Sequence, residues 1–181
     1  MIDFFSIALG AIIGVITGAA GNFLYAEIKN RLAFRQFDVC GTWAEHISNI
    51  DGREYSLGIL YYDKIEDHFS YDGTSYKNDG EKHSHWQTIS SALELKQKRL
   101  YYIFAAYLDG NLGPANYGFG VINLTKAGDK FVPVDGYFVS PSVEASPCVH
   151  SMIRVQMKYD RANNGKEFIN FMRGRGAKPA A

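Results

Sequence analysis

The chain has 181 residues, which is enough for one domain of ordinary size with an appendage. Lys plus Arg and Asp plus Glu balance at 19 each, which excludes a global basic field that would attract a nucleic acid polymer or an anionic surface. Cys40 and Cys148 are the only cysteines, too few for a disulfide framework and without the paired spacing of a zinc site. We therefore expect two thiols in a reducing compartment, and neither a metal nor another cofactor.

The sequence of the N-terminal segment predicts a membrane anchor. No charged residue occurs from Phe4 to Ala26, and as a helix this run would span roughly 34 Å, enough to cross a bilayer. A cleaved signal peptide is the main alternative, but its n-region would contain Asp3 and no basic residue. Lys29, Arg31 and Arg35 follow the run, so the positive-inside rule predicts a single-pass protein whose C-terminal domain is cytoplasmic.

Three glycines lie on one face of this predicted helix. Gly10, Gly14 and Gly18 recur every four residues, a spacing that lets a second helix backbone approach closely. This pattern favours a homo-oligomer that associates within the bilayer. The alternative is that glycine is simply common in transmembrane helices.

The remainder of the chain predicts an all-β domain. Turn signals such as Asp51-Gly52, Asp79-Gly80, Asp109-Gly110 and Ala127-Gly128-Asp129 separate runs rich in Tyr, Phe, Ile, Val and Thr. Because short hairpin connections make neighbouring strands antiparallel and closure removes exposed edges, we predict an eight-stranded antiparallel up-and-down β-barrel. The eight predicted strands are 42–50, 54–64, 68–77, 85–96, 100–108, 117–125, 130–140 and 151–159.

The last strand and the segment after it complete the domain. Alternation predicts one buried face made of Ile153, Val155, Met157 and Tyr159. A short C-terminal helix should follow, because Phe168, Ile169, Phe171 and Met172 recur at helical spacing. We thus divide the chain into a transmembrane helix with its juxtamembrane linker (1–35), a cytosolic barrel with a closing helix (36–173) and a disordered tail (174–181).

The sequence contains no motif that points to catalysis. No nucleophile elbow, phosphate loop, dinucleotide fingerprint or zinc-protease motif occurs, so we do not expect an enzyme. Gly41-Thr42-Trp43 opens the first strand in the way that Gly-x-Trp opens lipocalin-type barrels, where the Trp plugs one end. An ordinary core Trp is the alternative interpretation.

Aromatic and cationic residues on neighbouring strands are the candidates for ligand binding. Tyr76, Trp86 and Tyr102 offer flat faces that can stack on a nucleobase, and half-buried structural residues are the alternative. Lys77, Arg154 and Lys158 carry charges that can meet a phosphate.

Several stretches also resemble a known family. They are FSYDGTSYKNDG from Phe69 to Gly80, then His85-Trp86, and later Asp135-Gly136-Tyr137-Phe138. With the anchor and the strand order, they resemble the CD-NTase-associated transmembrane β-barrel effectors of CBASS, the cyclic-oligonucleotide-based anti-phage systems of bacteria. Many relatives carry two or more membrane helices, whereas this sequence predicts one.

The resemblance implies a receptor and an effector in one chain. The barrel would bind a cyclic dinucleotide made by a cognate nucleotidyltransferase, and the clustered anchors would then disrupt the bacterial inner membrane and kill the infected cell. In the related Panoptes-type systems the nucleotide instead holds the effector silent. A membrane-tethered, lipocalin-like carrier of a lipid or other apolar ligand is the alternative function, because eight-stranded barrels often enclose such molecules. A tethered scaffold with a filled barrel is a third.

Overall fold

The computed structural model describes residues 18, 21, 35–48, 54–108, 113–141, 147–157 and 165–175. The chain divides into two compact units, Met1–Asp38 and Val39–Ala181. Most of the predicted transmembrane helix, including Gly10 and Gly14, lies outside the described residues, whereas Gly18 is helical and exposed. Within the described residues, no helix has both the length and the apolar character needed to cross a membrane. The anchor therefore stays a prediction.

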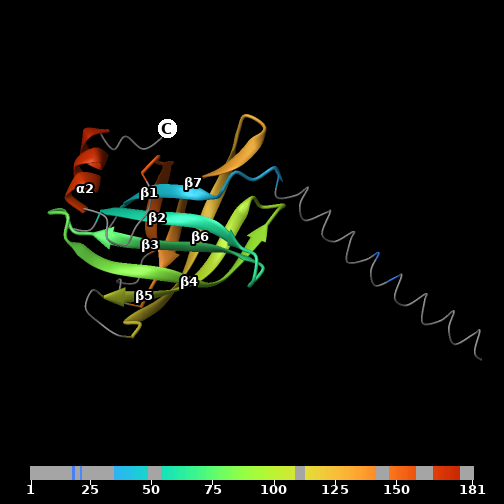
Figure 1. Cartoon of the computed structure of the whole chain (residues 1–181), viewed down its shortest axis with the longest axis horizontal. Coiled ribbons are helices and arrows are strands. Elements are labelled where there is room, and N and C mark those ends of the chain that lie inside the picture. The colour runs from blue at the N-terminus through green and yellow to red at the C-terminus, as the bar shows by residue number, and fades with distance from the viewer. Residues whose placement is uncertain are drawn as a thin grey trace, which may run out of the picture. The chain divides into compact units, whose positions relative to one another are not determined.

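The second unit contains a closed antiparallel barrel, in which each strand pairs with its sequence neighbours and β1 pairs with β8 (Figure 1). This confirms the predicted eight-stranded up-and-down barrel. The β3–β4 ladder covers only Gly73–Tyr76 of β3, and farther along these strands the side chains of Thr88 and Ser91 on β4 bond to the backbone of β3. The strands are β1 (Gly41–Ile47), β2 (Tyr55–Asp63), β3 (His68–Tyr76), β4 (Lys82–Glu94), β5 (Arg99–Leu108), β6 (Asn116–Ala127), β7 (Lys130–Val139) and β8 (Cys148–Arg154).

Two of the four predicted hairpin turns lie within the described residues, and their glycines have the expected positive φ angles. Gly80 and Gly128 have positive φ angles of 88° and 66°, which a tight hairpin requires and which glycine adopts without steric cost. Asp67 and Lys98 also have positive φ angles, both 56°, and the sequence did not indicate either turn. The predicted turns at Asp51-Gly52 and Asp109-Gly110 lie outside the described residues.

The prediction for the last strand is wrong in position and in face. β8 begins and ends earlier than 151–159, and its buried residues are Cys148, His150 and Met152, whereas Ile153 is 37% exposed. The alternation was misread because one inward position holds a polar residue, His150, which breaks the apolar pattern. Val155 is buried, but it lies beyond the strand in a cluster beneath the C-terminal helix.

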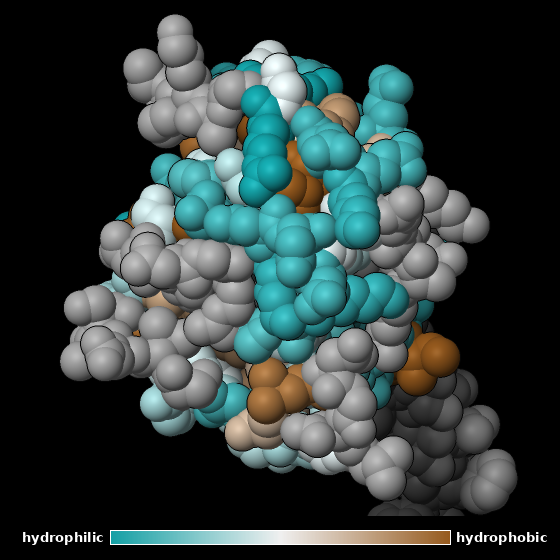
Figure 2. Space-filling view, turned by 90° about the vertical axis from the view of Figure 1, so that its left-hand side faces the viewer, coloured by the Kyte–Doolittle hydropathy of each residue, from teal (hydrophilic) through white to brown (hydrophobic). Residues whose placement is uncertain are grey.

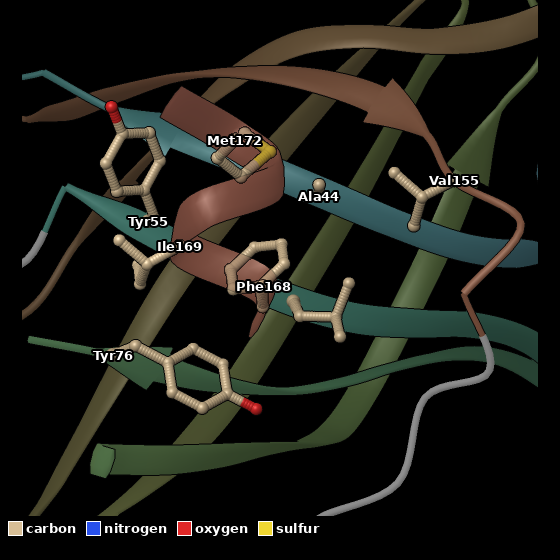
Figure 3. Packing of buried hydrophobic residues seen from close by; sticks show 8 residues of the cluster. Ala44, Tyr55, Tyr76, Val155, Phe168, Ile169 and Met172 are labelled. Atoms are coloured by element: carbon tan, nitrogen blue, oxygen red, sulfur yellow. The ribbon is translucent and has the colours of Figure 1, made fainter. Parts of the chain in front are cut away.

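The C-terminal helix was predicted correctly. Helix α2 (Gly165–Gly174) buries Phe168, Ile169 and Met172 against the outer face of β1, β2 and β3, where Figure 3 shows them packed. Its opposite side is exposed, and hydrophilic residues dominate the described part of the molecular face on which α2 lies (Figure 2). The helix fits closely: a Cβ at Gly165 would lie 2.1 Å from the carbonyl oxygen of Gly80. The predicted tail beyond residue 175 is outside the described residues.

Candidate functional site

One end of the barrel is hollow. A cavity of about 350 Å³ lies where β1, β3, β5 and β7 finish and β2, β4, β6 and β8 begin. Among the described residues that line it, none is Lys or Arg. They are Glu45, Ile47, Ser56, Ser75, His83, Ser84, Trp86, Tyr102, Phe104, Ala106, Tyr107, Leu108, Ala115, Asn116, Phe138 and Ser140.

The other end of the barrel is packed around Trp43, as the Gly-x-Trp pattern predicted. The Trp43 side chain is 3% exposed, and its indole Nε1–H donates a hydrogen bond of 2.8 Å to the carbonyl oxygen of Val39. The Arg154 guanidinium lies over the indole, 5.1 Å from the ring centroid, and donates a hydrogen bond to the carbonyl oxygen of Cys40. A cation over an indole face and a satisfied N–H make this end a stable plug.

Glycines set the aromatic walls of the hollow end. A Cβ at Gly73 would lie 2.3 Å from the Trp86 ring, and one at Gly120 would lie 2.2 Å from the Tyr102 ring. Each ring therefore packs closely over the glycine that pairs with it on the neighbouring strand. Gly118 makes room for Phe104 in the same way, since a Cβ there would lie 2.3 Å from the Phe104 ring. The signal in the sequence was the alternation Gly118-x-Gly120, because glycine inside a strand marks a close approach.

A buried polar pair lies within the same barrel interior. Oε1 of Glu45 and Nδ1 of His150 are 2.8 Å apart, with side chains that are 5% and 0% exposed. Neither ring nitrogen of His150 is aligned for a hydrogen bond, so the contact is one of proximity. Burial, with a further contribution from the Glu45 carboxylate, raises the pKa of Tyr102 well above its ordinary value. Sequence reasoning missed Glu45, although Trp43, Glu45 and Ile47 alternate on one strand face.

The structure brings two of the predicted ligand residues together. Trp86 and Tyr102 line the same cavity, and each makes an edge contact with Tyr71, at ring-centroid distances of 5.9 Å in both cases. Lys77 lies in the β3–β4 turn at the same end of the barrel, where its Nζ pairs with Glu81 Oε2 at 2.8 Å.

Two of the other candidates lie elsewhere. Tyr76 points to the outer face and is fully buried under α2, where its ring meets Phe168 at 5.4 Å. Arg154 lies at the closed end over Trp43. Lys158 lies outside the described residues. Tyr76 and Arg154 therefore do not line the cavity of Trp86 and Tyr102, because strand parity turns Tyr76 outward and Arg154 lies at the opposite end of the barrel.

Comparisons with known proteins add no assignment. No family model matches the chain, and no curated protein or solved structure gives a significant match. Across the described part of the chain, no three His, Cys, Asp or Glu side chains are grouped so that they could hold a metal ion. The functional argument therefore depends on the chemistry of the cavity.

Proposed function

We propose that this protein is a membrane-anchored receptor whose barrel binds a cyclic dinucleotide made by a partner nucleotidyltransferase in a bacterial anti-phage system. The observation that carries the proposal is an open cavity walled by Trp86 and Tyr102, since aromatic rings stack on nucleobases. Its volume of about 350 Å³ is near the lower end for ligand sites, so one base enters the barrel and the rest of the ligand stays at the mouth.

The charges around the cavity favour this orientation. Glu45 makes the interior unfavourable for a phosphate, whose negative charge would face a carboxylate in a region of low dielectric constant. Basic residues occur at the mouth instead, where Lys82 and His83 begin β4 and Lys77 lies in the preceding turn. In the proposed orientation the ligand phosphates would lie near these basic residues while the base is buried.

The effector half of the proposal requires chains to associate. On the outer wall of β5–β8, Ile103 pairs across the sheet with Phe119, and Phe119 with Val139. Seven large apolar side chains on this wall are 36–56% exposed, which is typical of an interaction surface. They are Ile103, Tyr117, Phe119, Tyr137, Val139, Val149 and Ile153. Association through this wall would gather the anchors predicted in 1–35 and disrupt the inner membrane, causing cell death without catalysis.

A second candidate function is a tethered carrier of an apolar ligand. It is favoured by one observation, the absence of Lys and Arg among the described residues that line the cavity. An uncharged or weakly polar ligand would need no cation there.

Calorimetric titration of the full chain in detergent separates these functions. The ligands are cyclic di-AMP, cyclic di-GMP and, for the carrier function, a long-chain fatty acid. We expect a cyclic dinucleotide to bind, and Trp86→Ala to weaken it by about tenfold or more, because a stacked base contributes about 1–3 kcal/mol. Tyr61→Ala is the matched control, since Tyr61 on β2 is 36% exposed and does not line the cavity. Binding of the fatty acid alone would reject the receptor in favour of the carrier.

A further inference from the structure

Glu45 is an unusual residue for the lining of an aromatic cavity. Its carboxylate is buried, and it is the only acidic side chain among the described residues that line the cavity. Removing an ionised carboxylate from water is strongly unfavourable unless it is paired and hydrogen-bonded. A buried carboxylate in a ligand cavity therefore needs partners, some of which the ligand itself can supply.

His150 satisfies only part of this need. Its Nδ1 approaches one carboxylate oxygen, Oε1, at 2.8 Å, whereas a carboxylate has about four acceptor positions on its two oxygens. The imidazole also packs closely on the backbone of Gly136, where an added Cβ would lie only 2.7 Å from Nε2. Pairing of β1 with β8 sets Ile47 opposite His150 and so fixes Glu45 beside it on the inner face. Glu45 is thus a rigid acceptor with capacity left for a ligand.

The chemistry of the acceptor selects the ligand. Two neighbouring N–H donors on one edge match the two oxygens of a carboxylate. Among nucleobases guanine presents this edge, with N1–H beside the N2 amino group, whereas adenine places the N1 lone pair beside its amino group. That lone pair would face the carboxylate in a desolvated site, which is repulsive.

We infer that Glu45 reads the N1–H and N2–H edge of a guanine that enters the cavity, so that the protein prefers a guanine-containing cyclic dinucleotide. This inference rests on the proposed function. The wall rings of Trp86 and Tyr102 bury the faces of the base, and Glu45 distinguishes its edge.

Ligand variants test the inference without changing the protein. The full chain in detergent is titrated with cyclic di-GMP, cyclic di-AMP and cyclic di-IMP, whose hypoxanthine keeps N1–H but lacks the 2-amino group. We expect cyclic di-GMP to bind about tenfold or more tightly than either of the others, because each leaves the buried carboxylate short of a donor.

Glu45→Gln is the matching protein variant, because it keeps the shape and the acceptor toward His150 but replaces one oxygen with an amide donor. It should reduce the preference for cyclic di-GMP over cyclic di-AMP by about tenfold. Glu167→Gln, on the exposed side of α2, should leave the preference unchanged. If Glu45→Gln does not fold, Glu45→Asp withdraws the carboxylate by one methylene group and should lower the same preference.

The outcomes separate the inference from the function on which it rests. If no cyclic dinucleotide binds, both are overturned. If one binds but cyclic di-GMP is not preferred, or the preference survives at Glu45→Gln or Glu45→Asp, only the role of Glu45 is overturned.

Discussion

The two ends of the barrel each contain one of the two tryptophans, and they use it differently. Trp43 is 3% exposed beneath the Arg154 guanidinium, whereas Trp86 is half-buried in the wall of a cavity. The difference comes from what fills the interior around each ring. Large buried residues such as Leu100 and Ile122 pack the closed half, while small residues, Ser56, Ser75, Ser84 and Ala106, line the open half. Side-chain size along the strands thus divides the interior of one barrel into a packed core and an open cavity.

The largest expected effect is on the closed end. Trp43→Ala should lower the free energy of unfolding by about 3–5 kcal/mol, because it leaves a cavity in a packed core. Trp86→Ala should lower the free energy of unfolding by clearly less, since the Trp86 ring already borders an open cavity. Chemical denaturation of both full-length variants measures the two losses. Equal losses would show that the hollow end is as tightly packed as the closed one.

The second effect concerns the open end alone. Gly73→Ala places a Cβ 2.3 Å from the Trp86 ring and should destabilise the protein by about 1–3 kcal/mol while pushing the indole into the cavity. Because the displaced indole would narrow the cavity, the affinity for a cyclic dinucleotide should also fall. Gly113→Ala is the matched control, because no atom lies within 4 Å of its added Cβ, and it should change neither stability nor affinity. Unchanged binding by Gly73→Ala would mean that Trp86 does not set the width of the site.

The smallest effect is a pH dependence from Tyr102. The pKa of its phenol is raised in the folded protein, mainly by burial, so the folded state keeps a proton that the unfolded chain releases above about pH 10. Stability from this group is complete below that pH and declines as the pH rises further, by up to about 1.4 kcal/mol per pH unit. Tyr102→Phe should flatten that decline, as unfolding measured from pH 9 to 11 would show. An unaltered slope would mean that the hollow end already admits water to the phenol.

Much of the fold could be predicted because its signals are local. Alternating residues and turn glycines such as Gly80 and Gly128 specified eight antiparallel strands in order, and apolar spacing specified α2. Cys40 is exposed, Cys148 is buried and the two are not joined by a disulfide, as predicted. The membrane anchor also depends on a local run of apolar residues, and it remains a prediction from sequence.

The candidate site was only partly predictable, because it depends on which way each strand faces. Trp86 and Tyr102 were recognised as aromatic residues on neighbouring strands, but the same reasoning included Tyr76, which α2 covers on the outside. A shift of one residue in a strand's register moves each side chain to the other face of the sheet, and amino-acid composition does not reveal such a shift.

What the sequence determined by itself is the order of strands and the closing helix. Only the tertiary structure decided that one end is hollow and that Glu45 meets His150 inside it. These two residues are more than a hundred positions apart, and they meet only because β8 pairs with β1 to close the barrel. Closure of the barrel brings together residues that no local sequence pattern connects, so the composition of the cavity lining depends on the pairing of β8 with β1.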